Sequence, residues 1–125
     1  MAIERAAVLG AGVMGSGIAA QIANAGIPVL LLDVVPKDAD DRDGLAKAAL
    51  ARMQRADPAP FMSRQAARLV TPGNLEDDLE TLGEMDWIVE AVVESLEIKQ
   101  ALYAKLEAVR KPGSIVSSNT STLPL

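Results

Sequence analysis

The sequence contains neither cysteine nor histidine among its 125 residues. The absence of cysteine excludes disulfide bonds, thiolate metal sites and cysteine nucleophiles. The absence of histidine removes the commonest general base and metal ligand, and with it any serine–histidine pair. Together these absences exclude most enzymatic mechanisms from the chain itself, and we expect no metal site.

Aromatic residues are scarce, since only Phe61, Trp87 and Tyr103 are present. The core must therefore be aliphatic, which argues against an aromatic stacking platform for single-stranded nucleic acid. Acidic residues outnumber basic ones by 17 to 12, for a net charge of −5. Because binding to a phosphate backbone needs a basic face, we expect no nucleic-acid partner. The length suits a single domain.

Charge is missing altogether between Arg5 and Asp33. Such a run invites comparison with a membrane span or a signal peptide, but glycines and a proline divide it into residues 5–9, 13–25 and 28–32. The pieces are typical of a strand, a helix and a second strand in a parallel sheet covered on both faces. We therefore predict a buried β–α–β unit, no membrane contact and a cytoplasmic location.

The alternation of strands and helices continues through the rest of the chain. Patterning predicts helices over residues 39–56, 64–68 and 96–110, strands over 69–71, 86–92 and 114–118, and a short acidic helix or turn over 75–82. This order predicts an α/β fold with a doubly wound, mainly parallel sheet of the Rossmann type.

The most informative motif is GAGVMG, which runs from Gly10 to Gly15 between the first predicted strand and the first predicted helix. In this context G-x-G-x-x-G is typical of a dinucleotide-binding turn. Gly10 permits the tight turn, Gly12 lets a pyrophosphate approach the backbone, and Gly15 lets the helix pack closely on the strand. The N–H groups at the helix start, where Val13 and Met14 lie, would face the phosphates.

Asp33 ends the second predicted strand, about 20 positions beyond the glycines, where an acidic residue binds the adenosine ribose hydroxyls. A carboxylate accepts hydrogen bonds from both hydroxyls and repels a 2′-phosphate, so NAD is favoured over NADP, and FAD is the less favoured alternative. The alternative role for Asp33 is a loop cap. Gly17, inside the helix, together with Ala19, Ala20 and Ala23 suggests very close packing on the sheet.

Three segments resemble L-3-hydroxyacyl-CoA dehydrogenases. They are GAGVMGSG at residues 10–17, DWIVEAVVE at residues 86–94 followed by Lys99, and SSNTSTL at residues 117–123. The resemblance runs from Arg5 to Leu125. It implies that residues 1–125 form part of an NAD-binding domain, incomplete relative to that of the family, and that a C-terminal substrate and dimerisation domain is absent from this chain.

The resemblance also implies roles for residues after the later strands. Ala91, Glu94 and Lys99 would line the nicotinamide half of the NAD site, Ser121 would contact the substrate's 3-hydroxyl or the nicotinamide, and Asn119 would shape the loop beside it. The alternative roles are a solvated ion pair at a helix start for Glu94 and Lys99, and a helix cap or turn for Asn119 and Ser121. Glu90 is interpreted as structural.

The resemblance places a further site in the helical segment after the second strand, which binds the acyl-CoA nucleotide in this family. Arg42, Lys47 and Arg52 are candidates for that contact, but we favour the interpretation that they are ordinary helix-surface charges. The segment over residues 36–74 resembles large bacterial proteins in which the dehydrogenase is fused to an enoyl-CoA hydratase.

The general-base histidine of the family has no counterpart in this sequence. We therefore expect the isolated chain to lack catalysis, and to be marginally stable or self-associating. The parent enzyme would oxidise L-3-hydroxyacyl-CoA to 3-ketoacyl-CoA in fatty-acid β-oxidation, as a homo-oligomer. Two alternatives are a non-catalytic, crystallin-like NAD-binding protein and a dehydrogenase of the 3-hydroxyisobutyrate type, against which the SNTST segment argues.

Overall fold

A single five-stranded sheet forms the centre of the molecule, and all of its paired strands are parallel. The computed structural model describes residues 3–35, 41–55, 64–91 and 96–118. The strands are β1 (Ala6–Leu9), β2 (Val29–Asp33), β3 (Val70–Asn74), β4 (Trp87–Glu90) and β5 (Ile115–Ser118), in the order β3-β2-β1-β4-β5. This order confirms the predicted Rossmann-type α/β fold.

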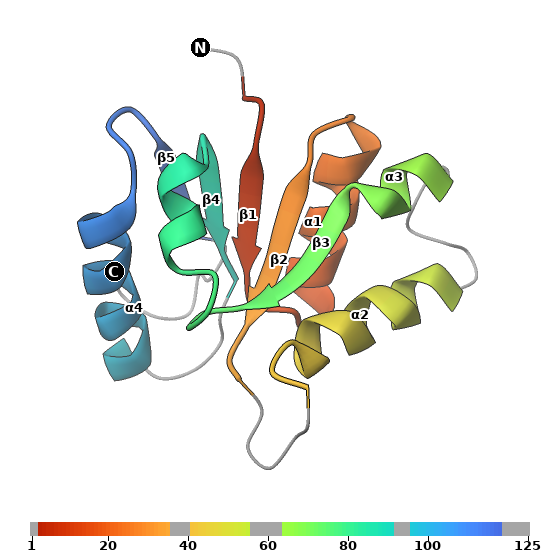
Figure 1. Ribbon diagram of the computed structural model, residues 1–125, viewed down its shortest axis with the longest axis horizontal. Coiled ribbons are helices and arrows are strands. Elements are labelled where there is room, and N and C mark those ends of the chain that lie inside the picture. The colour runs from red at the N-terminus through yellow and green to blue at the C-terminus, as the bar shows by residue number, and fades with distance from the viewer. Residues whose placement is uncertain (1–2, 36–40, 56–63, 92–95, 119–125) are drawn as a thin grey trace.

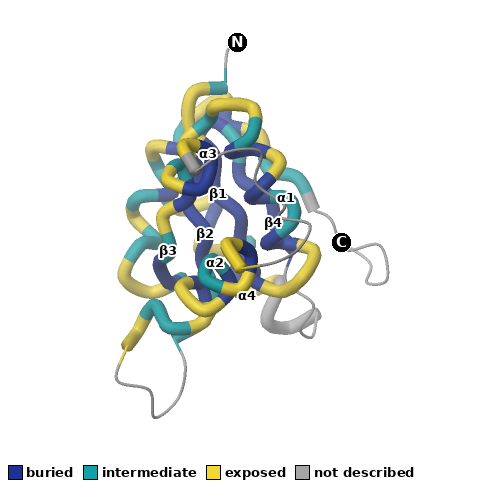
Figure 2. Tube along the Cα trace, turned by 90° about the vertical axis from the view of Figure 1, so that its right-hand side faces the viewer, coloured by how far each residue is buried: buried dark blue, intermediate teal, exposed yellow. Residues whose placement is uncertain are grey.

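Helices cover both faces of this sheet (Figure 1). One face carries α1 (Val13–Asn24), α2 (Gly44–Arg55) and α3 (Arg64–Arg68), and the other carries the 3₁₀ helix η1 (Glu80–Glu84) and α4 (Leu96–Val109). Figure 2 shows the buried strands at the centre, surrounded by exposed helix surfaces. Covering on both faces explains why β1 and β2 are almost uninterruptedly apolar in sequence.

Alternating side chains of β1 divide the core into two layers. Ala6 and Val8 face α1, whereas Ala7 and Leu9 face η1 and α4. All four are fully buried. Both layers are built mainly from aliphatic side chains, as the scarcity of aromatic residues requires.

The structure corrects two predicted boundaries and decides between two alternatives for a third segment. Strand β3 continues to Asn74 through Pro72 and Gly73, which we expected to close the strand. Proline is tolerated there because β3 is an edge strand, with a partner on one side only. Helix α2 begins at Gly44, after a turn in which Asp43 N–H donates to the Asp41 carboxylate. The acidic segment after β3, predicted as a short helix or turn over residues 75–82, forms turns and then η1 at Glu80–Glu84.

Within the described ranges, no helix combines the length and the hydrophobicity that a membrane crossing requires.

Candidate functional site at the carboxyl edge of the sheet

The parallel strands bring several predicted site residues to one edge of the sheet. In Figure 1 the arrows point to the same end of the molecule, so the carboxyl ends of β1, β2 and β4 lie there together. The glycine turn leads from β1 into α1, Asp33 ends β2, and Ala91 follows β4. Ligands of open α/β sheets bind at this edge. The topology therefore assembles a site from segments that lie far apart in the sequence.

Steric contacts within the turn explain two of its glycines. Gly10 has a φ of 109°, which side chains other than glycine rarely adopt. A Cβ on Gly15 would lie 1.8 Å from the Gly10 carbonyl oxygen and 3.4 Å from the Cβ of Ala91. Gly15 therefore allows the start of α1 to pack directly against the turn and against the segment after β4.

Gly12 has no such intramolecular reason to be glycine. Its φ is −71° and its ψ is −172°, an extended conformation that any residue adopts, and a Cβ there would meet nothing within 4 Å. Gly12 is also the N-cap of α1, and no described side chain caps this helix. The first N–H groups of a helix lack intrahelical partners and favour anions. Open space beside such a helix start fits a phosphate group.

The surroundings of Gly17 are more open than predicted. It is partly exposed, and a Cβ there would also meet nothing within 4 Å. The predicted close packing of α1 on the sheet is provided by the other three residues, Ala19, Ala20 and Ala23, which are buried.

The Asp33 carboxylate lies at the end of β2 and reaches back to the glycine turn. Its Oδ2 accepts the Ala11 N–H at 2.8 Å, and its Oδ1 accepts the Val34 N–H at 2.6 Å. Because an ionised carboxylate offers about four acceptor positions, both oxygens retain acceptor capacity. Asp33 therefore caps the turn and still has the chemistry to accept two ribose hydroxyls.

Two apolar side chains of the turn face solvent. Val13 is 89% exposed and Met14 is 56% exposed. They adjoin the helix start and Gly12. Their position is consistent with the predicted contact with a cofactor, because apolar side chains exposed at a ligand-binding edge provide van der Waals surface for a ligand.

The remaining predicted site residues divide into described and undescribed positions. Ala91 is buried, and its N–H donates to the Leu9 carbonyl at 2.8 Å. Lys99 belongs to α4, but its side chain lies outside the described part. Glu94, Asn119 and Ser121 lie outside the described residues entirely.

Glu90, interpreted as structural, is fully buried at the end of β4. The Tyr103 hydroxyl on α4 donates to Glu90 Oε1 at 3.3 Å. The pair ties the helix to the strand beneath the site, which supports a structural role.

A network of charged side chains joins the segment after β3 to the segment before α2. Arg42 donates to Asp77 at 2.8 Å and to Glu76 at 2.9 Å. The hydrogen-bonded ion pair with Asp77, and to a smaller extent that with Glu76, raises the pKa of Arg42. The hydrogen bond from Arg42, followed by that from Asn74, lowers the pKa of Asp77. At the start of α2, Lys47 pairs with Asp41 at 2.9 Å.

These pairs bear on the cations considered for the acyl-CoA nucleotide. Arg42 and Lys47 are both engaged by carboxylates, whereas Arg52 is exposed on α2. Ordinary surface charge therefore explains two of the three. The described residues contain no group of three or more acidic side chains arranged to hold a metal ion.

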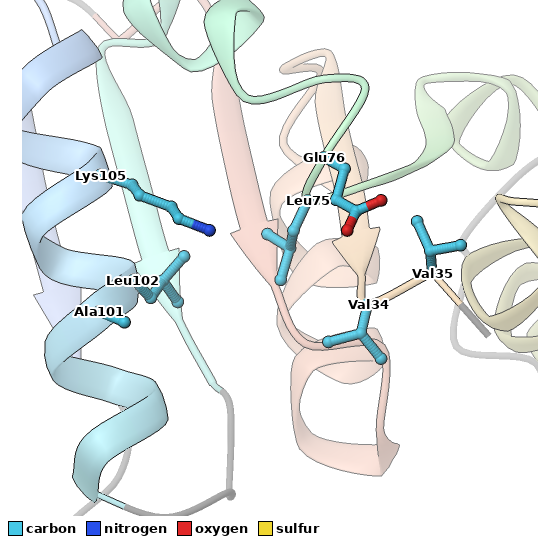
Figure 3. A pocket seen from close by; sticks show the side chains of 7 residues that line it. All are labelled: Val34, Val35, Leu75, Glu76, Ala101, Leu102 and Lys105. Atoms are coloured by element: carbon cyan, nitrogen blue, oxygen red, sulfur yellow. The ribbon is translucent and has the colours of Figure 1, made fainter. Parts of the chain in front are cut away.

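Sequence analysis missed a cavity of about 280 Å³ beside this edge. Figure 3 shows its walls: Val34 and Val35 after β2, Leu75 and Glu76 after β3, and Ala101, Leu102 and Lys105 on α4. One available signal was the apolar pair, Val34 and Val35, that follows Asp33 directly in the sequence. The contribution of α4 had no signal, because it depends on how the helix lies across the sheet.

Comparisons with known proteins agree on one family. Residues 5–125 match the family described as "3-hydroxyacyl-CoA dehydrogenase, NAD binding domain". The probable 3-hydroxyacyl-CoA dehydrogenase of Deinococcus radiodurans is 55% identical over 125 residues, covering 100% of this chain and 36% of that protein. The probable 3-hydroxyacyl-CoA dehydrogenase of Bacillus subtilis is 51% identical over 133 residues, covering 95% of this chain and 17% of that protein.

Among solved structures, FadB2 of M. tuberculosis superimposes with a TM-score of 0.78 at 34% identity, covering 99% of this chain and 43% of that one. The chain thus spans about a third or less of the length of these two sequence relatives.

Proposed function

Because the chain belongs to the family of 3-hydroxyacyl-CoA dehydrogenase NAD-binding domains, we propose that it is the cofactor-binding part of an enzyme that oxidises L-3-hydroxyacyl-CoA to 3-ketoacyl-CoA in fatty-acid β-oxidation. Membership of this family is the observation that supports the proposed reaction. The carboxyl-edge site supports the cofactor role. The same membership favours the hydroxyacyl-CoA class over the 3-hydroxyisobutyrate class of dehydrogenase.

The observation that carries the cofactor assignment is the space at Gly12. No protein atom requires glycine there, yet the residue lies at an uncapped helix start between two sterically required glycines. We assign the pyrophosphate to Gly12 and the first N–H groups of α1, beside Val13 and Met14. The ribose hydroxyls are assigned to Asp33. When bound, NAD supplies the hydride acceptor for oxidation of the substrate.

The nicotinamide half is assigned to residues that follow β4 and β5. Ala91, Glu94 and Lys99 would line it, and Asn119 and Ser121 would border the substrate. Ala91 lies beside the glycine turn, since it is 3.4 Å from the Cβ position of Gly15. This proximity supports continuity between the phosphate site and the segment after β4.

We further propose that these 125 residues bind NAD without turning over substrate. Oxidation of a hydroxyl requires a proton acceptor as well as a hydride acceptor, and the chain has no histidine to act as a base of the family type. Acyl-CoA binding and any assembly into a homo-oligomer are proposed for the whole enzyme.

Calorimetric titration of the chain with NAD, and with NADP in parallel, tests the cofactor assignment. We expect NAD to bind and NADP to bind at least about tenfold more weakly, because Asp33 would face the extra phosphate. Equal binding of both would contradict the role of Asp33. Absence of NAD binding to a chain with a cooperative thermal transition would overturn the cofactor assignment.

Turnover is tested separately, by following NADH absorbance with a 3-hydroxyacyl-CoA. No NADH is expected from the chain alone. NADH formation would show that a proton acceptor other than histidine is present in these residues.

A further inference from the structure

The cavity beside Asp33 has an apolar interior formed by three segments. Five of its seven lining residues are apolar: Val34, Val35, Leu75, Ala101 and Leu102. Figure 3 shows Leu102 reaching from α4 toward the strand side, where Leu75 and Val34 lie. Its volume of about 280 Å³ is at the lower end of the ~300–1,000 Å³ of small-molecule pockets. The space therefore suits a single flat ring system better than a whole dinucleotide.

The place of the cavity relative to Asp33 limits what it can hold. Val34 follows Asp33 directly, so a ligand whose ribose hydroxyls meet the Asp33 carboxylate extends toward Val34. The group attached to that ribose on the side away from the phosphates is a nucleobase. A dinucleotide at the carboxyl edge thus places one base at the entrance of this cavity.

Two charged side chains line the otherwise apolar cavity. Glu76 follows β3, and Lys105 extends from the opposite side on α4 (Figure 3). Arg42 donates to Glu76 Oε2 at 2.9 Å, so the second carboxylate oxygen of Glu76 remains available as an acceptor. Among the described ion pairs, none joins Glu76 to Lys105. The cavity therefore presents an acceptor from one wall and a donor from the other.

This pairing matches adenine. The exocyclic amino group of adenine donates hydrogen bonds, and its ring nitrogens accept them. Resting on the function proposed above, we propose that Glu76 and Lys105 select the base of the dinucleotide. The Glu76 carboxylate accepts from the adenine amino group, and the Lys105 ammonium donates to N3 or N7, ring nitrogens that accept hydrogen bonds in hypoxanthine as well as in adenine. The residues that select the base would then be separate from the glycine motif and from Asp33.

A phosphate is a poorer occupant of the same cavity. The Glu76 and Asp77 carboxylates both pair with Arg42, so the Arg42 charge is already engaged, and Asp33 adds a further negative charge nearby. The apolar interior also offers a dianion no hydrogen bonds. Lys105 therefore acts beside a neutral ring and not as a phosphate contact.

The test compares NAD with nicotinamide hypoxanthine dinucleotide, which carries an oxo group in place of the adenine amino group. Calorimetric dissociation constants are measured for the wild type, Glu76→Gln and Lys105→Met. Glu80→Gln and Glu107→Gln serve as matched controls, since both glutamates are exposed and neither lines the cavity. Circular dichroism melts verify that every variant folds.

We expect the wild type to prefer NAD over the hypoxanthine analogue by about tenfold, the value of one hydrogen bond to a charged group. Glu76→Gln should bring this ratio close to one, because an amide both accepts from the amino group and donates to the oxo group. Lys105→Met should weaken both dinucleotides several-fold without changing the ratio. Both controls should match the wild type within about twofold.

Four results would overturn the inference. The first is NAD binding by the wild type with no preference over the analogue. The second is a ratio unchanged in Glu76→Gln, and the third is NAD affinity unchanged in Lys105→Met. A selective loss of NADP binding in Lys105→Met would identify a phosphate contact instead. Each of these leaves the proposed NAD site standing, whereas failure of the folded wild type to bind NAD at all overturns both proposals.

Discussion

Asp33 Oδ2 accepts the backbone N–H of Ala11 at 2.8 Å, which joins the end of β2 to the glycine turn after β1. The same carboxylate accepts the Val34 N–H through Oδ1, so its orientation is held by backbone groups on both sides. The proposed ribose contact and the proposed phosphate turn are thus connected within the protein itself. A carboxylate positioned in this way loses little side-chain entropy when a ligand binds.

Replacing Asp33 by Asn should separate the two roles of this residue. One acceptor oxygen is lost, so one backbone N–H loses its partner and the free energy of unfolding should fall by about 1 kcal/mol. NAD affinity should fall by about tenfold or more, and the preference for NAD over NADP should shrink because the negative charge is gone. Paired titrations with both dinucleotides, alongside a urea melt, measure the two effects. An unchanged NAD/NADP ratio would contradict the assignment.

Substitution of Gly12 tests the space beside the helix start. Gly12→Ala should cost about 1 kcal/mol in stability, because alanine is a poor N-cap, while the added Cβ meets no protein atom. NAD affinity should fall at least about tenfold, since the Cβ enters the phosphate position. Gly17→Ala is the matched control within the same helix: it should stabilise the chain by about 0.5–1 kcal/mol and leave affinity unchanged. Equal affinities for the two variants would place the phosphates elsewhere.

Gly15 should tolerate no side chain. A Cβ there would lie 1.8 Å from the Gly10 carbonyl oxygen, a backbone atom that cannot move without displacing the turn. Gly15→Ala should therefore lower the free energy of unfolding by about 3 kcal/mol or more, the upper end of the costs of overpacking. Chemical denaturation beside the wild type measures the loss. A melt indistinguishable from that of the wild type would show that α1 can shift away from the turn.

Asn74 is a buried amide surrounded by acids. Its Nδ2 donates to Asp43 at 2.7 Å and to Asp77 at 2.9 Å, and its Oδ1 accepts the N–H groups of Glu76 and Asp77. Asn74→Asp replaces the donor by a third carboxylate and should cost about 3 kcal/mol at pH 7. Below about pH 4 the new carboxyl can carry a proton and donate again, so the difference from the wild type should narrow. A loss that does not depend on pH would point to packing instead.

The Asp86 carboxylate should stabilise the folded chain, and this stabilisation should be lost at acidic pH. The ion pair with Lys111, followed by the N–H groups of Glu4 and Arg5, lowers the pKa of Asp86 to about 2. Because the folded pKa is below the unfolded value, the stabilisation is fully present above about pH 4 and is lost as the pH falls toward 2. The melting temperature of Asp86→Asn should therefore lie below that of the wild type at pH 7, and the two should converge near pH 2.

The matched control for Asp86→Asn is Glu84→Gln. Glu84 pairs with Arg5 at 3.6 Å, and both side chains are more than half exposed. Surface pairs of this kind contribute little, so its melting temperature should follow the wild type at every pH. A difference in melting temperature between Asp86→Asn and the wild type that stays constant from pH 7 to pH 2 would contradict the stabilising role of the Asp86 charge.

Much of the fold could be predicted because it depends on neighbours in the sequence. Apolar runs separated by glycine and proline are enough to predict β1, α1 and β2, and the scarcity of aromatic residues is enough to predict an aliphatic core. Prediction failed where a partner strand decides the outcome. The end of β3 is an example. Pro72 and Gly73 disfavour strand formation, yet both pair with β2, and this is tolerated because β3 lies at the edge of the sheet.

The order of strands and helices, the glycine turn and the acid at the end of β2 could all be predicted from the sequence, because turn geometry and side-chain periodicity are local properties. The set of residues that surround the site depends instead on tertiary packing. Glu76 and Lys105 line one cavity because a strand order and a helix position bring them together. Asp86 binds a backbone group 82 positions away for the same reason. Such contacts depend on how distant segments pack, and no local pattern encodes that packing.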